Sequence, residues 1–114
     1  MSFAYEKRNA ARLFDAFENG SLPMDEMVRL TAEADPALVY LMFAWLRGRY
    51  RSGHPASDGV LGRIVAVCTK SSKVARMVRS GESDPISEWF EETYEYRDFD
   101  REDFIDVVVE KLES

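Results

Sequence analysis

Residues 35–46 read DPALVYLMFAWL, and this stretch decides the fold class. Asp35 precedes Pro36, a pair that favours a helix start: the carboxylate can cap the first turn, and the N–H that proline lacks would be unpaired there anyway. The next ten residues, 37–46, are all apolar or aromatic. A helix that is apolar on every side is central and buried in a soluble protein. The stretch therefore predicts a core helix over 36–50.

Start and stop signals outside this helix divide the chain into about six helices in all. The pair Asp84–Pro85 repeats the start signal, and Ser71–Ser72 predicts a break or kink. Ser57 or Asp58 is expected to cap the helix that follows it. The remaining predicted segments are 3–19, a short helix after Pro23, 59–69 with a further helical part beyond the break or kink that ends at Gly81, 85–96, and a last helix beginning at Asp100.

Two segments need a separate interpretation. Residues 51–55, RSGHP, have the composition of a loop. Residues 107–109 are three valines, which favour a β-strand because their side chains are β-branched. No second convincing strand exists to pair with them, so a helix is favoured there too.

The sequence thus predicts one all-α domain over residues 1–114, a compact bundle or orthogonal array of five to six helices. With 114 residues the chain can build a single core. Its apolar content of 46% argues against disorder. The residues expected to pack on the central helix are Phe14, Phe17, Ile64, Val67, Phe90 and Phe104.

The cysteine content and the length of the apolar runs bear on the cellular compartment of the protein. Cys68 is the single cysteine, so no internal disulfide can form, which suits a reducing environment. The first eight residues lack the apolar run of a secretory signal. The longest apolar run, ten residues, is half of the about 20 that a membrane span needs. We expect a cytoplasmic protein that does not use the membrane.

Charge is sorted along the chain. Residues 1–46 carry four bases and seven acids, residues 47–79 eight bases and one acid, and residues 80–114 three bases and thirteen acids. The three balances, −3, +7 and −10, sum to the net charge of −6. Such segregation concerns long-range fields and charged partners rather than the fold.

The favoured functional hypothesis is an acidic surface that docks a basic protein. Glutamates at 88, 91, 92 and 95 would share one face of a helix over 85–96. Opposite fields speed the capture of a partner, and tyrosine is a typical interface anchor. The alternative without a partner is that these acids only keep the protein soluble. The acidic surface, in a non-enzymatic regulator or inhibitor, consists of Glu88, Glu91, Glu92, Glu95, Tyr96 and Asp98.

The alternative hypothesis is a nucleic-acid-binding adaptor that uses the basic middle of the chain. The two short helices around Ser71–Ser72 could form a helix-turn-helix with residues 73–79 in the major groove. Two structural explanations need no nucleic acid. Arginines at the C-terminal end of a helix are stabilised by the helix dipole, and the other bases could pair with the acids of 85–96. The basic surface consists of Arg47, Arg49, Arg51, Lys70, Lys73, Arg76 and Arg79.

Catalytic and metal chemistry find little support in the sequence. One histidine and one cysteine cannot supply the ligands of a typical zinc site. Cys68 and His54 could pair only through tertiary folding, and Cys68 lies in an apolar segment where a buried thiol is inert. We expect no cofactor and no enzymatic activity. A homodimer is possible, because the last two helices carry more aromatic residues than one core needs.

Overall fold

The computed structural model of the chain describes residues 3–51 and 53–114, and every regular element in that part is helical. The all-α prediction is confirmed, and residues 107–109 are helical. The described residues form seven α-helices rather than five to six, because Ser71 lies outside helical geometry and separates two full helices, α4 and α5. The elements are α1 (Phe3–Asn19), α2 (Met24–Glu33), α3 (Pro36–Arg49), α4 (Ser57–Lys70), α5 (Ser72–Glu82), α6 (Pro85–Thr93), the 3-10 helix η1 (Tyr96–Asp98) and α7 (Arg101–Glu113).

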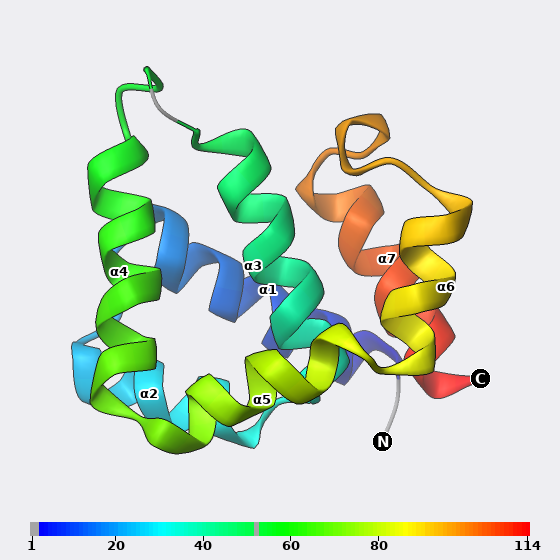
Figure 1. Cartoon of the computed structure of the whole chain (residues 1–114), viewed down its shortest axis with the longest axis horizontal. Coiled ribbons are helices and arrows are strands. Elements are labelled where there is room, and N and C mark those ends of the chain that lie inside the picture. The colour runs from blue at the N-terminus through cyan, green and yellow to red at the C-terminus, as the bar shows by residue number, and fades with distance from the viewer. Residues whose placement is uncertain (1–2, 52) are drawn as a thin grey trace.

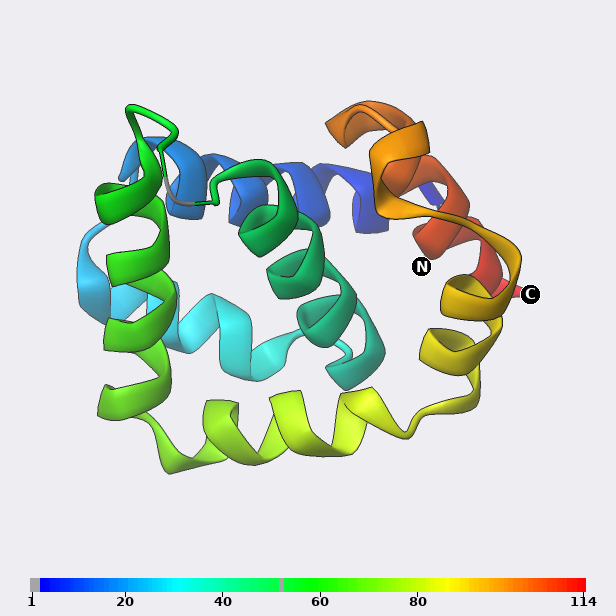
Figure 2. The same cartoon turned by 45° about the horizontal axis from the view of Figure 1, so that its top comes forward.

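The helices surround α3. In Figures 1 and 2, α3 runs through the middle of the molecule, with α4 on one side and the α6–α7 pair on the other. Figure 2 shows α1 and α5 closing the two remaining sides. The chain measures 33 × 29 × 26 Å along its principal axes, and one hydrophobic cluster draws on all seven α-helices.

The central helix α3 forms as predicted. The backbone N–H of Ala37 donates to the side chain of Asp35 (2.8 Å), and Pro36 occupies the first helical position. Trp45 is 3% exposed, and its indole N–H donates to the backbone oxygen of Phe99 (3.4 Å). The six residues predicted to pack around this helix are all buried: Phe14, Phe17, Ile64, Val67, Phe90 and Phe104.

At Gly81, helix α5 approaches the beginning of α3 so closely that no side chain fits between the two backbones. A Cβ atom added to Gly81 would lie 2.2 Å from the backbone oxygen of Pro36 and 2.8 Å from Cβ of Tyr40. Gly81 was predicted to end its helix, yet α5 continues to Glu82. Gly81 therefore serves the close approach of two backbones.

The prediction of a helix to residue 96 is wrong, because α6 ends at Thr93. Tyr94 is extended (φ −128°, ψ 162°), and the chain turns back through η1 toward α7. At this turn the ring of Tyr94 lies 5.4 Å from that of Phe90 and 5.1 Å from that of Phe99, so three aromatic rings close the turn on itself. The aromatic residues of this region pack against the core, Phe90 and Phe104 fully buried and Tyr94, Tyr96 and Phe99 partly so.

The start of α4 also differs from the prediction. Ala56 precedes the helix and no side chain caps it, so neither Ser57 nor Asp58 acts as the cap. Ser57 is instead buried in the first turn. Ser52, in the loop predicted over 51–55, lies outside the described residues, and no described residue of that loop is helical.

Ion pairs connect α1 to α7 at both ends of the contact. The ammonium group of Lys7 lies 3.3 Å from a carboxylate oxygen of Asp106 and 3.0 Å from one of Glu110. Arg101 on α7 reaches α1 in return, 2.6 Å from Asp15 and 3.1 Å from Glu18. The first and last helices of the described chain are thus joined by ion pairs at two places along their contact.

Candidate functional site

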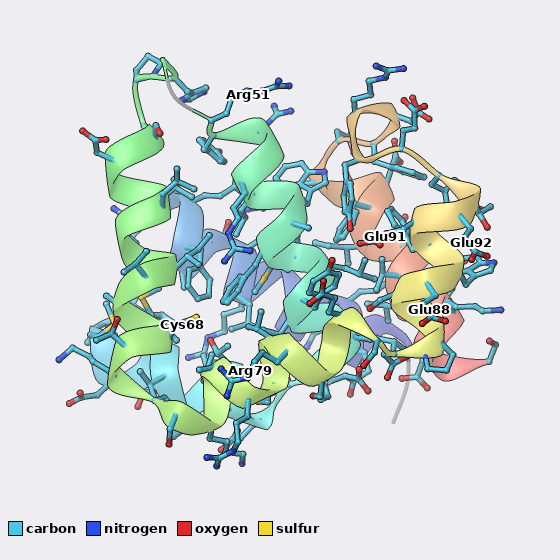
Figure 3. The ribbon with its side chains drawn as sticks, in the orientation of Figure 1. Arg51, Cys68, Arg79, Glu88, Glu91 and Glu92 are labelled. Carbon is cyan, nitrogen blue, oxygen red and sulfur yellow. The ribbon has the colours of Figure 1, made fainter. Side chains whose placement is uncertain are left out.

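The acidic surface comes from α6 and the turn that follows it. Glu88, Glu91 and Glu92 are exposed on α6. Figure 3 shows Glu91 on the side that faces α3 and Glu92 on the outer side. Glu95 lies beyond the helix in extended backbone (φ −112°, ψ 138°). The prediction that the four glutamates share one helix face is therefore wrong, because α6 ends before Glu95.

Glu91 is held by two tyrosines. Its Oε1 accepts hydrogen bonds from the hydroxyl of Tyr40 on α3 (2.9 Å) and from that of Tyr96 on η1 (3.2 Å). Burial raises the pKa of Tyr40 to about 12, and the hydrogen bond to Glu91 acts in the same direction. Burial, followed by the charge of Glu91, also raises the pKa of Tyr96. Both hydroxyls therefore remain donors at neutral pH, and Glu91 joins α3, α6 and η1.

The other members of the acidic surface are less engaged. Glu95 forms an ion pair with Arg97 (2.6 Å), in which both side chains are well exposed. Glu88, Glu92 and Asp98 are exposed and form no ion pair with any described residue. The acidic surface thus combines three unpaired carboxylates with the Glu91–Tyr96 bridge.

Three members of the basic surface lie in the last turn of α3 or just beyond it. The guanidinium of Arg47 lies 6.0 Å from the ring centre of Phe43, and that of Arg49 lies 5.3 Å from the ring centre of Trp45. Arg51 donates from Nε to the backbone oxygen of Gly48 (3.1 Å). Ring contacts and the helix dipole are enough to account for these arginines without a ligand.

The other four members lie on α4 and α5. Lys70 is the last residue of α4, and α5 exposes Lys73, Arg76 and Arg79 while it buries Val74 and Met77. None of these four bases forms an ion pair within the described chain. The alternative in which they are neutralised by the acids of α6 is therefore wrong.

The eighth base of the middle segment, Arg63 on α4, has a structural role. Its Nη1 donates to the backbone oxygens of Phe17 (2.9 Å) and Glu18 (3.4 Å). These carbonyl groups belong to the last turn of α1, where no backbone N–H follows to bond them. The guanidinium also covers Gly20, which has a φ of +65°. Arg63 thus caps α1 and is not available as a ligand-binding cation.

The Cys68–His54 pair does not form. Figure 3 shows Cys68 near the end of α4, whereas His54 precedes the start of that helix. Nδ1 of His54 accepts from the backbone N–H of Ala56 (3.0 Å). Burial raises the pKa of the Cys68 thiol, which opposes formation of the reactive thiolate.

Two further features concern metals and membranes. Within residues 3–51 and 53–114, no group of three or more histidine, cysteine or acidic side chains is placed to hold a metal ion. No helix in that part of the chain combines the length and the apolar character that crossing a membrane requires.

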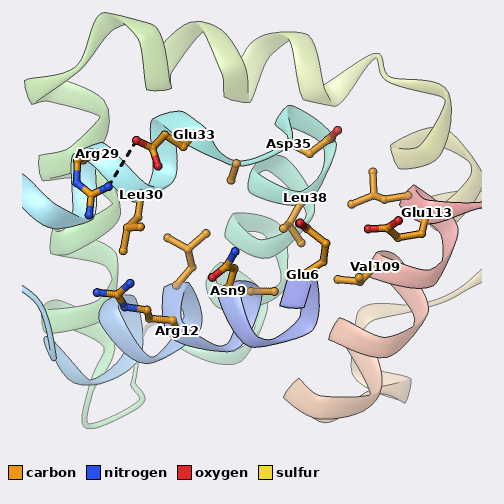
Figure 4. A pocket seen from close by; sticks show the side chains of 14 residues that line it. Glu6, Asn9, Arg12, Arg29, Leu30, Glu33, Asp35, Leu38, Val109 and Glu113 are labelled. Atoms are coloured by element: carbon orange, nitrogen blue, oxygen red, sulfur yellow. Dashed lines mark hydrogen bonds and ion pairs between the residues drawn. The ribbon is translucent and has the colours of Figure 1, made fainter. Parts of the chain in front are cut away.

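Two of the hollows in the described part of the molecule bear on function, and neither was predicted from the sequence. One, of about 340 Å³, brings Arg49 and Arg51 of the basic surface against Tyr96 of the acidic surface, beside Arg97 and Phe99. The other, of about 390 Å³, lies between α1, the end of α2, the beginning of α3 and the end of α7 (Figure 4). Its lining comes from four separate helices, so no local pattern in the sequence could have indicated it.

Comparison with protein-family models, with curated proteins and with solved structures yields no match for this chain.

Proposed function

We propose that the protein is a non-enzymatic regulator or inhibitor that docks a basic partner protein through the acidic surface. The observation that carries this proposal is the exposure of Glu88, Glu92 and Asp98 without an ion pair to any described residue. Of the thirteen acids between residues 80 and 114, three form ion pairs within the described chain. Most of the negative charge therefore faces outward, where it attracts a cationic protein.

The Glu91–Tyr96 bridge supports the proposal in a second way. It joins α6 to η1, and the second hydrogen bond to Glu91, from Tyr40, joins both to α3, the most buried helix. The acidic surface is therefore held on a fixed scaffold. A surface that is already ordered loses less conformational entropy on binding. The negative field accelerates the encounter, and shape complementarity then determines how long the complex lasts.

A charge-reversal experiment tests this function. The double variant E88K/E92K is compared with D25K/D58K, because all four acids are exposed and unpaired and both variants change the net charge equally. The probe is a fluorescently labelled peptide rich in lysine and arginine, followed by anisotropy. We expect E88K/E92K to weaken binding at least about tenfold and D25K/D58K to weaken it far less. Equal weakening would mean that the peptide senses only net charge, against the proposal.

Nucleic-acid binding is a second candidate function, favoured by one observation. Lys73, Arg76 and Arg79 are exposed on α5 and unpaired within the described chain, so they are free to contact phosphate groups. Phosphate contacts release counterions, which makes affinity fall steeply as salt rises.

Anisotropy of labelled single- and double-stranded oligonucleotides, at about 50 and about 200 mM salt, tests this candidate. Micromolar binding that is lost in K73E/R76E but kept in R8E/R12E would support it. The control removes the same charge from α1, where both arginines are also exposed. Absence of binding at the lower salt concentration would exclude it, since charges are least screened there.

A further inference from the structure

The 390 Å³ pocket has charged ends and an apolar middle. Figure 4 shows Glu6, Asp35 and Glu113 at one end, and Arg12 and Arg29 at the other. Its volume lies within the range of small-molecule sites, about 300–1,000 Å³. A pocket of this design suits a ligand that has one charged group on a hydrocarbon body.

The acidic end contains a carboxylate oxygen without a partner. Oε1 of Glu6 is shielded from solvent and accepts no hydrogen bond from any described residue. A buried polar atom is unfavourable unless it is hydrogen-bonded, and a charged one more so. Glu6 therefore marks the point in the pocket where a hydrogen-bond donor, and best a cationic one, is stabilised most.

The arginine end is partly neutralised, because Arg29 is paired whereas Arg12 forms no ion pair within the described chain. Arg29 lies 2.6 Å from Glu26 and 3.5 Å from Glu33, so its charge is shared between two carboxylates. Neither Glu6 nor Glu113 forms an ion pair with any described residue, and the lining holds four acids against two bases. The electrostatic balance of the pocket thus favours a cation over an anion.

Apolar side chains line the space between the two ends. Leu13, Leu38 and Val109 form buried parts of the lining, and Leu30 and Leu112 contribute half-buried side chains. A hydrocarbon chain that covers them removes apolar surface from water. Inorganic cations would not gain from this part of the pocket, whereas an aliphatic amine would.

We propose that the pocket binds an aliphatic primary amine, with its ammonium group at Glu6 and its chain along the leucines between α1, α2 and α7. This inference goes beyond the proposed function and does not depend on the acidic surface, which is formed by other residues. The same chemistry is available from a free alkylamine and from a lysine side chain of another protein.

The first experiment titrates the whole protein with hexylamine and with hexanol, followed by backbone amide chemical shifts. We expect hexylamine to shift the amides of residues 6–13, 30–38 and 109–113. Hexanol, which has the same chain without the charge, should bind at least about tenfold more weakly. Equal binding of the two would overturn the proposal, because the carboxylates would then play no part.

Two variants test the site itself, with circular dichroism as the check that each folds. E6Q should weaken hexylamine binding about tenfold, whereas E92Q makes the same change at an exposed glutamate outside the pocket and should have no effect. A34F fills the pocket with a ring and should remove binding without changing any charge. If E6Q and E92Q behave alike, or A34F still binds, the amine does not occupy this pocket.

A final comparison distinguishes the two sources of the amine. Tighter binding of N-acetyl-lysine methylamide than of hexylamine would indicate a lysine side chain, and the reverse order a free alkylamine. Both results support the proposed chemistry. Failure of both probes to shift the pocket amides would overturn it, whatever the acidic surface does with a basic peptide.

Discussion

The two sides of α3 are held by opposite means. Toward α1 and α7, rings fill the space: Phe14 lies 5.4 Å from Trp45 and 5.8 Å from Phe104, measured between ring centres. Toward α5, a side chain is missing, and Gly81 brings the backbone of α5 against the carbonyl group of Pro36. Large side chains make the contact with α1 and α7, whereas the absence of a side chain makes the contact with α5.

This difference decides what can be found in a sequence. A large aromatic residue in an apolar run is expected to be buried wherever its partners come from. The need for a glycine, in contrast, depends on a second helix whose position the local sequence does not indicate. Gly81 therefore looks like a helix stop in the sequence, although it lies within α5.

The strongest test of the comparison removes volume from the aromatic side. Because Trp45 is 3% exposed, W45A should lower the free energy of unfolding by about 3–5 kcal/mol. Urea denaturation measures the loss. W89A is the control, since Trp89 is half-buried and should cost less. A loss below about 1 kcal/mol for W45A would mean that the rings do not hold α3.

The next test adds volume to the glycine side. G81A should cost about 3 kcal/mol, at the upper end of overpacking, because the clash is with backbone and cannot be relieved by a rotamer change. G48A is the matched control in α3, where a Cβ would meet no atom within 4 Å. It should be neutral or stabilise by up to about 1 kcal/mol. Similar thermal midpoints for the two variants would contradict the close approach.

A smaller effect is expected from the two Asp–Pro helix starts. Asp35 and Asp84 accept hydrogen bonds of 2.8 Å and 2.9 Å from backbone N–H groups, so D35A and D84A should each cost about 1 kcal/mol. D35A should lower the free energy of unfolding more than D84A does, because it loosens the end of α3 that contacts Gly81. Thermal denaturation compares them, and a larger loss in D84A would weaken the view that this contact holds the fold.

The smallest effect concerns Tyr40, which lies beside the glycine contact. Its folded pKa of about 12 is above the ordinary 10.0, so folding favours the neutral phenol. The stability that this provides is complete below pH 10 and is lost as the pH rises from 10 to 12. Y40F should cost about 0.5–1.5 kcal/mol at neutral pH, through the lost hydrogen bond to Glu91.

Urea unfolding of wild type and Y40F, at several pH values up to 12, checks the sign of this linkage. The gap between the two proteins should narrow as the pH rises above 10. A gap that stays constant would mean that the Tyr40 hydroxyl is not the group that titrates.

Local signals explain how much of the fold could be predicted. Asp35, Asp84 and Asp100 cap helices through their own next two or three residues, and all three starts are correct. The end of α6 has no such signal: no glycine or proline follows Thr93, and Tyr94 turns out of the helix with its ring against that of Phe99. The boundary was therefore misplaced by three residues, from 93 to 96.

The candidate site could be predicted only in outline. The sequence shows which charged residues cluster, but it left open whether the basic residues are exposed or paired internally, and the structure places them on the surface. The sequence could not indicate that Glu91 accepts two tyrosine hydroxyls or that Arg63 caps α1, because these partners come from other helices. The leucine-lined pocket was missed for the same reason.

The pairing of α1 with α7 has a consequence for synthesis on the ribosome. Phe14 packs against Phe104, and Lys7 pairs with Asp106 and Glu110. These partners emerge long after α1 has been made, so α1 cannot complete its packing until α7 is available. The part of its apolar face that packs on α7 must remain uncovered until residues 101–113 have left the exit tunnel, and during that interval the nascent chain is exposed to aggregation or to chaperone binding.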